Sequence, residues 1–289
     1  MADASSLTDL VGAELSEPVD PRVTAMASAL AAQYPGSARA VLFYGSCLRE
    51  TRLDGLMLDF YLIVSDYGDA YARRWMAFAN RLIPPNVFPF QHDGLMAKYA
   101  VLNEADFHRL NGPETRNVSV WARFAQPSRL VWSVDHVATA RAVAAVARAA
   151  PTLLAAAGAA AGEDALDWWR RAFSLTYSVE LRAERTHRAQ SVVDADPQRY
   201  RDFTAPAAAA IEPGVRSGGW ARRRAEGKAL SVARLAKASL TYAGGIDYLA
   251  WKINRHAGTQ IEIKPWQRRW PLLAALTLVP RLIRGGAIR

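Results

Sequence analysis

The chain has 289 residues, of which 51% are hydrophobic and 22% charged, and it carries a formal net charge of +9. This composition supplies enough apolar material for a core and excludes a disordered or fibrous chain. The single cysteine, Cys47, excludes a disulfide scaffold and a metal site built from several cysteines. The positive charge favours an anionic partner. Only five of the 36 basic residues are lysine, so the arginine codons of a GC-rich genome are an alternative explanation for the excess of basic residues.

The N-terminal residues indicate where the chain resides. Several acids precede the first basic residue, Arg22, whereas a secretory signal or a mitochondrial presequence would be basic there. No continuous apolar run approaches the roughly 20 residues of a spanning helix. We therefore expect a protein of the reducing cytoplasm that is not an integral membrane protein.

Apolar periodicity, with breaker residues between the runs, predicts alternating helices and strands in the first 135 residues. The predicted elements are a helix over 22–33, strands over 40–44 and 56–64, a helix over 70–82, a strand over 95–102 and a helix over 104–110. Asn103 is placed to cap the last of these helices. Two charged residues interrupt the apolar strands: Asp59 lies in the second strand and Lys98 in the third.

The remainder of the chain is predicted to be mostly helical. An alanine-rich helix over 137–161 breaks at Pro151, a charged helix covers 163–190, and 204–219 form a loop or linker. We therefore expect the α+β fold class. The expected organisation is a catalytic domain over 1–135, a helical second domain over 136–260 and a basic tail over 261–289.

The most informative stretch is Tyr44-Gly45-Ser46 at the end of the first predicted strand, followed by Asp59 in the second. Glycine lets the backbone approach a triphosphate, and successive N–H groups together with the Ser46 hydroxyl form an anion-binding concavity. A carboxylate within an apolar strand carries a desolvation cost that Mg²⁺ would offset. Nucleotidyltransferases combine these features for phosphate transfer, although each feature alone also occurs in ordinary turns and strand ends.

Short sequence blocks extend this pattern along the chain. They are YGS at 44–46, MLDF at 57–60, KYAV at 98–101, ARFAQP at 122–127, LTYSVELR at 175–182, and a run from Lys237 through Gly244 and Tyr248 to Lys252. In order and spacing they resemble the peripheral CDP-diacylglycerol synthases of the mitochondrial translocator-assembly-and-maintenance type, phosphatidate cytidylyltransferases that also occur in bacteria. The corresponding family patterns are YGSG, M-[IL]-D-F, K-Y-G-V-I, A-G-R-x-x-K-P, L-S-Y-x-G-D-x-R and K-G-x-x-T-A-G-x-x-x-x-x-Y.

The resemblance implies a fold, a reaction and a set of site residues. The fold is a nucleotidyltransferase-type mixed sheet followed by a winged-helix-like domain, and the reaction is transfer of a cytidylyl group from CTP to phosphatidic acid with Mg²⁺, giving CDP-diacylglycerol and pyrophosphate. The implied residues are Asp59, Lys98 and Arg123 for catalysis, with Asp59 holding Mg²⁺, and Gly45, Ser46, Tyr177 and Arg182 for binding the nucleotide. Each role has a structural alternative. Lys98 also suits an ordinary lysine at a strand edge, and Arg123 suits a structural ion pair. Tyr177 and Arg182 suit one face of an amphipathic helix.

The sequence also departs from the family pattern. Nucleotidyltransferases usually carry a second acid two residues away on this strand, whereas Met57 and Tyr61 flank Asp59 here. Cys47 stands where the pattern has glycine, and Gln126 where it has lysine. Two alternatives therefore stay open: a nucleotidyltransferase with another acceptor, and an inactive relative that binds membranes.

The C-terminal residues 264–289 predict a membrane-associating tail. They contain six basic residues and no acid, and Trp266 and Trp270 lie beside an apolar stretch over 272–279. These features are typical of a peripheral anchor on an anionic membrane; a helix docked on the protein body is the alternative. We expect the inner face of a bacterial cell membrane as the location, phosphatidic acid and a nucleoside triphosphate as partners, and no specific nucleic acid.

Overall fold

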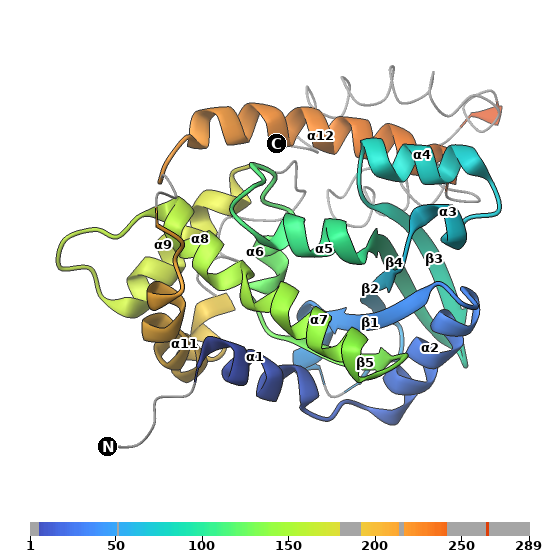
Figure 1. The fold of residues 1–289 in the computed structure, drawn as a ribbon, viewed down its shortest axis with the longest axis horizontal. Coiled ribbons are helices and arrows are strands. Elements are labelled where there is room, and N and C mark those ends of the chain that lie inside the picture. Colours follow the sequence, from blue (N-terminus) through green and yellow to red (C-terminus); the bar gives the residue numbers. More distant parts are fainter. Residues whose placement is uncertain (1–5, 51, 180–191, 214–216, 242–263, 266–289) are drawn as a thin grey trace.

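The computed structural model describes residues 6–50, 52–179, 192–213, 217–241 and 264–265 (Figure 1). The elements of the first half are α1 (Leu7–Ser16), α2 (Pro21–Ala32), β1 (Ala38–Tyr44), the short 3₁₀ helix η1 (Ser46–Arg49), β2 (Met57–Val64), α3 (Tyr67–Ala70), α4 (Arg74–Leu82), β3 (Asn86–His92), β4 (Leu95–Asn103), α5 (Glu104–Asn111), α6 (Trp121–Phe124) and β5 (Ser128–Ser133). The second half contributes α7 (His136–Ala147), α8 (Ala149–Ala157), α9 (Ala165–Tyr177), α11 (Pro197–Ala209) and α12 (Trp220–Thr241).

One mixed sheet organises the fold. Its five strands have the order β3-β4-β2-β1-β5, in which β2 and β4 are parallel and the other neighbours are antiparallel. Helices α3 and α4 and strand β3 make the crossover between the two parallel strands. The predicted α+β class is confirmed.

Helices cover both faces of the sheet because its strands alternate apolar side chains between two cores. One core joins the sheet to α1, α5 to α9 and α11, and the other joins it to α2, α3 and α4. The first core is one connected cluster of buried side chains whose members range in sequence from Leu7 to Ala207. It therefore includes residues on both sides of position 135. The division into domains stays a prediction.

Short polar side chains start the helices where the sequence changes from loop to helix. Ser6 and Asp9 form a capping box on α1, and Asp20 precedes Pro21 at the start of α2. The predicted cap of α5 is confirmed, since the Asn103 side chain accepts a hydrogen bond from the Asp106 amide at 2.7 Å. These caps satisfy backbone amides that the first turn leaves without partners.

The element predictions were largely confirmed, with several differences in the helical half. The alanine-rich stretch divides at Arg148, and Pro151 lies in the first turn of α8, where a missing N–H costs no helical bond. The predicted loop over 204–219 was wrong at its start, because α11 continues through Pro206 to Ala209. Strands β3 and β5 and helix α1 were not predicted. The helix predicted over 163–190 corresponds to α9, which ends at Tyr177. Residues 180–191 lie outside the part of the chain that the structure describes.

Among the described residues, one stretch is long and apolar enough to cross a membrane by length and composition alone. It is His136–Ala157, and 61% of its most apolar window is buried inside the protein. It corresponds to α7 and α8, whose buried side chains belong to the first core. Core helices of water-soluble proteins pass the same test, so this stretch is accounted for by packing against the sheet.

Candidate functional site

Three neighbouring strands place the predicted site residues in one row. Asp59 in β2 pairs in register with Tyr44 of β1 on one side and with Lys98 of β4 on the other. Paired residues project to the same face, which here is the face of the first core, because Tyr61 lies two positions beyond Asp59. The charged pair therefore stands where that core ends.

The carboxylate of Asp59 is held between a glycine turn and a lysine. The Lys98 ammonium lies 2.8 Å from Oδ1, an atom enclosed by protein, in an ion pair that lacks the alignment of a hydrogen bond. On the other side, Gly45 has φ +95° and ψ −165°, a conformation almost confined to glycine. A Cβ at this position would lie 3.3 Å from Asp59 Oδ2, so the absent side chain makes room beside the carboxylate.

A cavity of about 160 Å³ opens beside Lys98, and its described lining includes neither Asp59 nor Gly45. Its lining includes four basic side chains from three parts of the chain: Lys98, Arg123, Arg234 and Lys237. Tyr44, Tyr61 and Pro85 contribute to the rest of its wall. A hollow with this many convergent cations favours a ligand that carries several negative charges.

Helix α12 brings two of these cations to the sheet. The Arg234 guanidinium donates to the Pro84 carbonyl from Nε and Nη2 at 2.9 and 2.6 Å, and from Nη1 to the Ser119 hydroxyl at 3.0 Å. The Lys237 ammonium donates to the carbonyls of Ile83 and Pro85. The loop after α4 thus fixes both side chains although they lie about 150 residues away in sequence.

The basic lining creates an electrostatic cost in the ligand-free protein. Burial, reinforced by the neighbouring Arg234, lowers the pKa of Lys237 to about 7. On the other side of Asp59, burial and the nearby carboxylate raise the pKa of the Cys47 thiol. An anion in the cavity would favour the charged form of Lys237 and offset this cost.

The structure brings together some of the predicted site residues and separates others. Asp59 forms an ion pair with Lys98, Gly45 leaves open the space beside the Asp59 carboxylate, and Arg123 of α6 lines the cavity while donating to the Ser119 carbonyl. Ser46 follows the turn and is exposed. Tyr177 ends α9, packs against the first core and is not part of the described cavity lining.

Other predictions fall on residues that the structure does not describe. Arg182 lies outside the described residues, and so does the tail apart from 264–265.

Sequence reasoning did not assign Arg234 and Lys237 to the site. Lys237 was noted only as the first residue of the last family-like block, and Arg234 was not noted. Their spacing of three places both on one face of α12, but many solvated helices show the same spacing. The scarcity of lysine in this chain was the one available signal.

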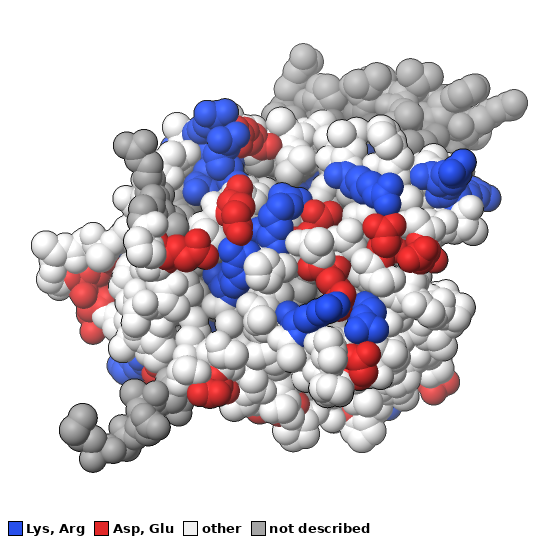
Figure 2. Space-filling model, viewed as in Figure 1, with Lys and Arg blue, Asp and Glu red and all other residues white. Residues whose placement is uncertain are grey.

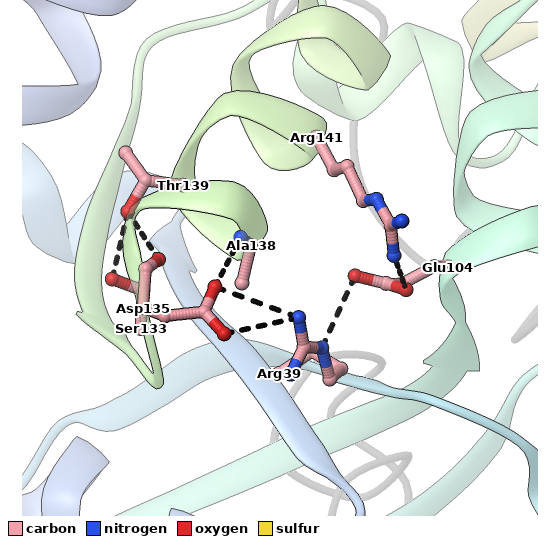
Figure 3. Close-up of polar contacts among 7 residues, drawn as sticks. All are labelled: Arg39, Glu104, Ser133, Asp135, Ala138, Thr139 and Arg141. Carbon is pink, nitrogen blue, oxygen red and sulfur yellow. Dashed lines mark hydrogen bonds and ion pairs between the residues drawn. The ribbon is translucent and has the colours of Figure 1, made fainter.

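A second cavity, of about 260 Å³, lies between the sheet and helices α5 and α7. Its lining is mostly apolar, and its charged residues already have partners (Figure 3). Glu104 accepts from Arg39 and Arg141, and Asp135 pairs with Arg39 and caps α7. These ion pairs join α5, α7 and β1, which is a structural role, whereas the cavity beside Asp59 collects cations.

The residues beside Asp59 fit a magnesium ion that substrate phosphates help to hold. Oδ1 of Asp59 accepts no hydrogen bond from the described residues, but it lies 2.8 Å from the Lys98 ammonium, which would share the carboxylate with the ion. No three His, Cys, Asp or Glu side chains cluster as metal ligands in the described part of the chain. Mg²⁺ is commonly bound through one or two carboxylates plus substrate phosphates, so one carboxylate beside a basic cavity is compatible with such an ion.

Comparison with known proteins adds no family. No protein-family model matches the chain, and no curated protein matches it.

Proposed function

We propose that the protein transfers a cytidylyl group from CTP to phosphatidic acid at a membrane surface. The observation that carries this proposal is the convergence of Lys98, Arg123, Arg234 and Lys237 on one cavity beside Asp59. Both substrates and both products carry phosphate groups, and arginine and lysine are the residues that neutralise phosphate charge. The identity of the two substrates follows from the family resemblance.

The size of the cavity indicates which part of the substrates it holds. Its volume of about 160 Å³ is below the roughly 300–1,000 Å³ of pockets that enclose a whole ligand. It therefore accommodates phosphate groups, while the acyl chains of the lipid stay outside the protein. An enzyme with this cavity suits an acceptor that presents only its headgroup.

In the proposed reaction, an oxygen of the lipid phosphate attacks the α-phosphorus of CTP. A new P–O bond forms, the bond from the α-phosphorus to the oxygen bridging it to the β-phosphorus breaks, and pyrophosphate leaves with the bonding electrons. Lys98 and Arg123 neutralise the charge that builds up on the phosphate oxygens. Bound Mg²⁺ would supply further charge neutralisation beside Asp59.

The turn after β1 would receive the triphosphate. Gly45 keeps the space beside Asp59 free of a side chain, and Ser46 presents an exposed hydroxyl next to it. Arg234 and Lys237 are anchored to backbone carbonyls of residues 83–85, so both side chains are positioned before a substrate binds, and the Arg234 guanidinium already carries its positive charge there. Such preorganised charge lowers the cost of binding and of the transition state.

The test is incubation of the purified protein with labelled CTP, Mg²⁺ and vesicles that contain phosphatidic acid. The wild type and Asp54→Asn, which changes an exposed carboxylate paired only with Arg22 among the described residues, should form labelled CDP-diacylglycerol. Asp59→Asn should lower the rate by about 100-fold or more, because it keeps the shape and removes the charge. Product formation by Asp59→Asn at the wild-type rate would contradict the assigned role.

One observation favours a second candidate function. The Lys98 ammonium lies 2.8 Å from Asp59 Oδ1 and neutralises the charge of this carboxylate. This arrangement also suits a protein that binds nucleotide phosphates without transferring them. Calorimetric binding of CTP together with no product from any tested vesicle would support this alternative over the synthase.

A further inference from the structure

Helix α4 exposes a stripe of large apolar side chains. Trp75, Phe78 and Leu82 are 43%, 66% and 66% exposed, and their spacing of three and four places them on one side of the helix. The opposite side packs Ala77 and Asn80 into the protein. We call the exposed side, defined by Trp75, Phe78 and Leu82, the α4 face.

Positive charges lie at both ends of the α4 face. Arg73 and Arg74 begin the helix, Arg81 lies in its last turn, and the sequence from 73 to 82 contains no acid. Arg81 pairs with Asp66 at 2.8 Å. Figure 2 shows basic side chains on this part of the surface, over α4. Apolar aromatic groups flanked by arginines are typical of helices that lie in the interface of an anionic membrane.

The α4 face adjoins the phosphate-binding cavity through the chain itself. The helix ends at Leu82, and the carbonyls of the next three residues bind Lys237 and Arg234. Pro85 from the same loop lines the cavity. A surface that contacts α4 therefore lies beside the loop that holds two of the four cavity cations.

We propose that the α4 face docks the protein on an anionic lipid bilayer and so places the cavity beside lipid phosphates. Trp75, Phe78 and Leu82 enter the boundary between headgroups and acyl chains, and the arginines contact lipid phosphates. The inference rests on the proposed function only for the identity of the lipid substrate. Membrane binding through α4 does not require catalysis.

The size of the α4 face favours a bilayer over a protein partner. Aromatic side chains bury about 150–250 Å² each when fully covered, so the exposed parts of Trp75 and Phe78 offer about 200 Å², to which Leu82 adds one aliphatic side chain. A stable protein complex buries about 800 Å² on each partner. A bilayer requires no such complementary surface, and the basic rim matches its charge.

The experiment measures binding of the full-length protein to vesicles of phosphatidylcholine with and without phosphatidic acid, by cosedimentation. The test variant is Phe78→Ser with Leu82→Ser, and the matched control is Val134→Ser with Val137→Ser, which replaces side chains exposed by 48% and 41% on another part of the surface. The test variant should bind acidic vesicles at least about tenfold more weakly, and the control should bind like the wild type. Equal binding of the test variant and the wild type would overturn the proposal.

A fluorescent probe separates the bilayer from other occupants of the α4 face. Cys47 is buried, so the variant Phe78→Cys takes an environment-sensitive label at one site. The label should shift to the blue when acidic vesicles are added, and this shift supports docking. A blue-shifted label without vesicles shows that another segment of this chain covers the face, and a shift that follows protein concentration shows a second copy. Either result overturns the proposal.

Calorimetry with CTP keeps this proposal distinct from the proposed function. The Phe78→Ser, Leu82→Ser variant should bind CTP like the wild type. Loss of vesicle binding with CTP binding retained supports the α4 face whether or not CDP-diacylglycerol is formed. Failure of the synthase assay with α4-dependent vesicle binding intact would reject only the proposed reaction.

Discussion

Replacing Gly45 by alanine tests the close approach of the turn to Asp59. The residue has φ +95° and ψ −165°, where a side chain costs about 1–3 kcal/mol, a tolerable loss against the usual 5–15 kcal/mol of unfolding free energy. The new Cβ would lie 3.3 Å from Asp59 Oδ2, so the carboxylate must move by a few tenths of an ångström. A misplacement of this size in a site that depends on geometry should weaken CTP binding about tenfold.

Gly55→Ala is the matched control. Gly55 also has a positive φ, +75°, but a Cβ there would have nothing within 4 Å. Urea unfolding should show losses of similar size for both variants, whereas calorimetry with CTP and Mg²⁺ should show weaker binding only for Gly45→Ala. The reasoning is refuted if Gly45→Ala binds CTP like the wild type, or if both variants lose the same affinity.

Three further predictions concern other parts of the structure. The unfolded chain keeps the Lys237 proton up to about pH 10.5, whereas the folded protein loses it near pH 7. Between these pH values the free energy of unfolding of the wild type should therefore rise relative to that of Lys237→Met, by up to about 1.4 kcal/mol per pH unit. A constant difference between the two proteins in urea unfolding at every pH would contradict this prediction. Arg199→Leu should lower the free energy of unfolding by about 3–5 kcal/mol because it leaves Glu14 buried without its partner, and adding Glu14→Leu should recover most of that loss. Equal losses in the single and double variants would argue against the pairing. Cys47 is buried and its pKa is raised by burial and by Asp59, so a thiol reagent should modify it only after urea unfolding, and rapid labelling of the native protein would show that the thiol is accessible.

Local sequence patterns predicted the parts of the site that lie on strands. A buried strand is an apolar run, so a charged residue within it is visible from the sequence, as Asp59 and Lys98 were. The glycine after β1 was likewise marked by the break between apolar run and turn. In the structure Asp59 pairs with Lys98, and Gly45 leaves open the space beside the Asp59 carboxylate.

Helical residues of the site were harder to predict because a helix shows the same polar pattern whether its charges face solvent or a cavity. Arg234 and Lys237 lie in α12, where charged residues at this spacing suit a solvated helix surface equally well. Hydrogen bonds to the loop at 83–85 turn these two side chains toward the sheet. Tyr177, for which the motif implies a nucleotide contact, is partly buried against the first core, and its role stays a prediction.

The sequence by itself determined the α+β class, three of the strands, and the positions of the glycine turn, Asp59 and Lys98 on them. These features depend on the period of two along a strand and on residues that break it, which are local properties. Only the tertiary structure decided that α12 completes a basic cavity beside Lys98 and that α4 exposes its apolar side next to it. Both depend on contacts between segments far apart in the chain, because packing, and not spacing, selects which face of a helix is covered.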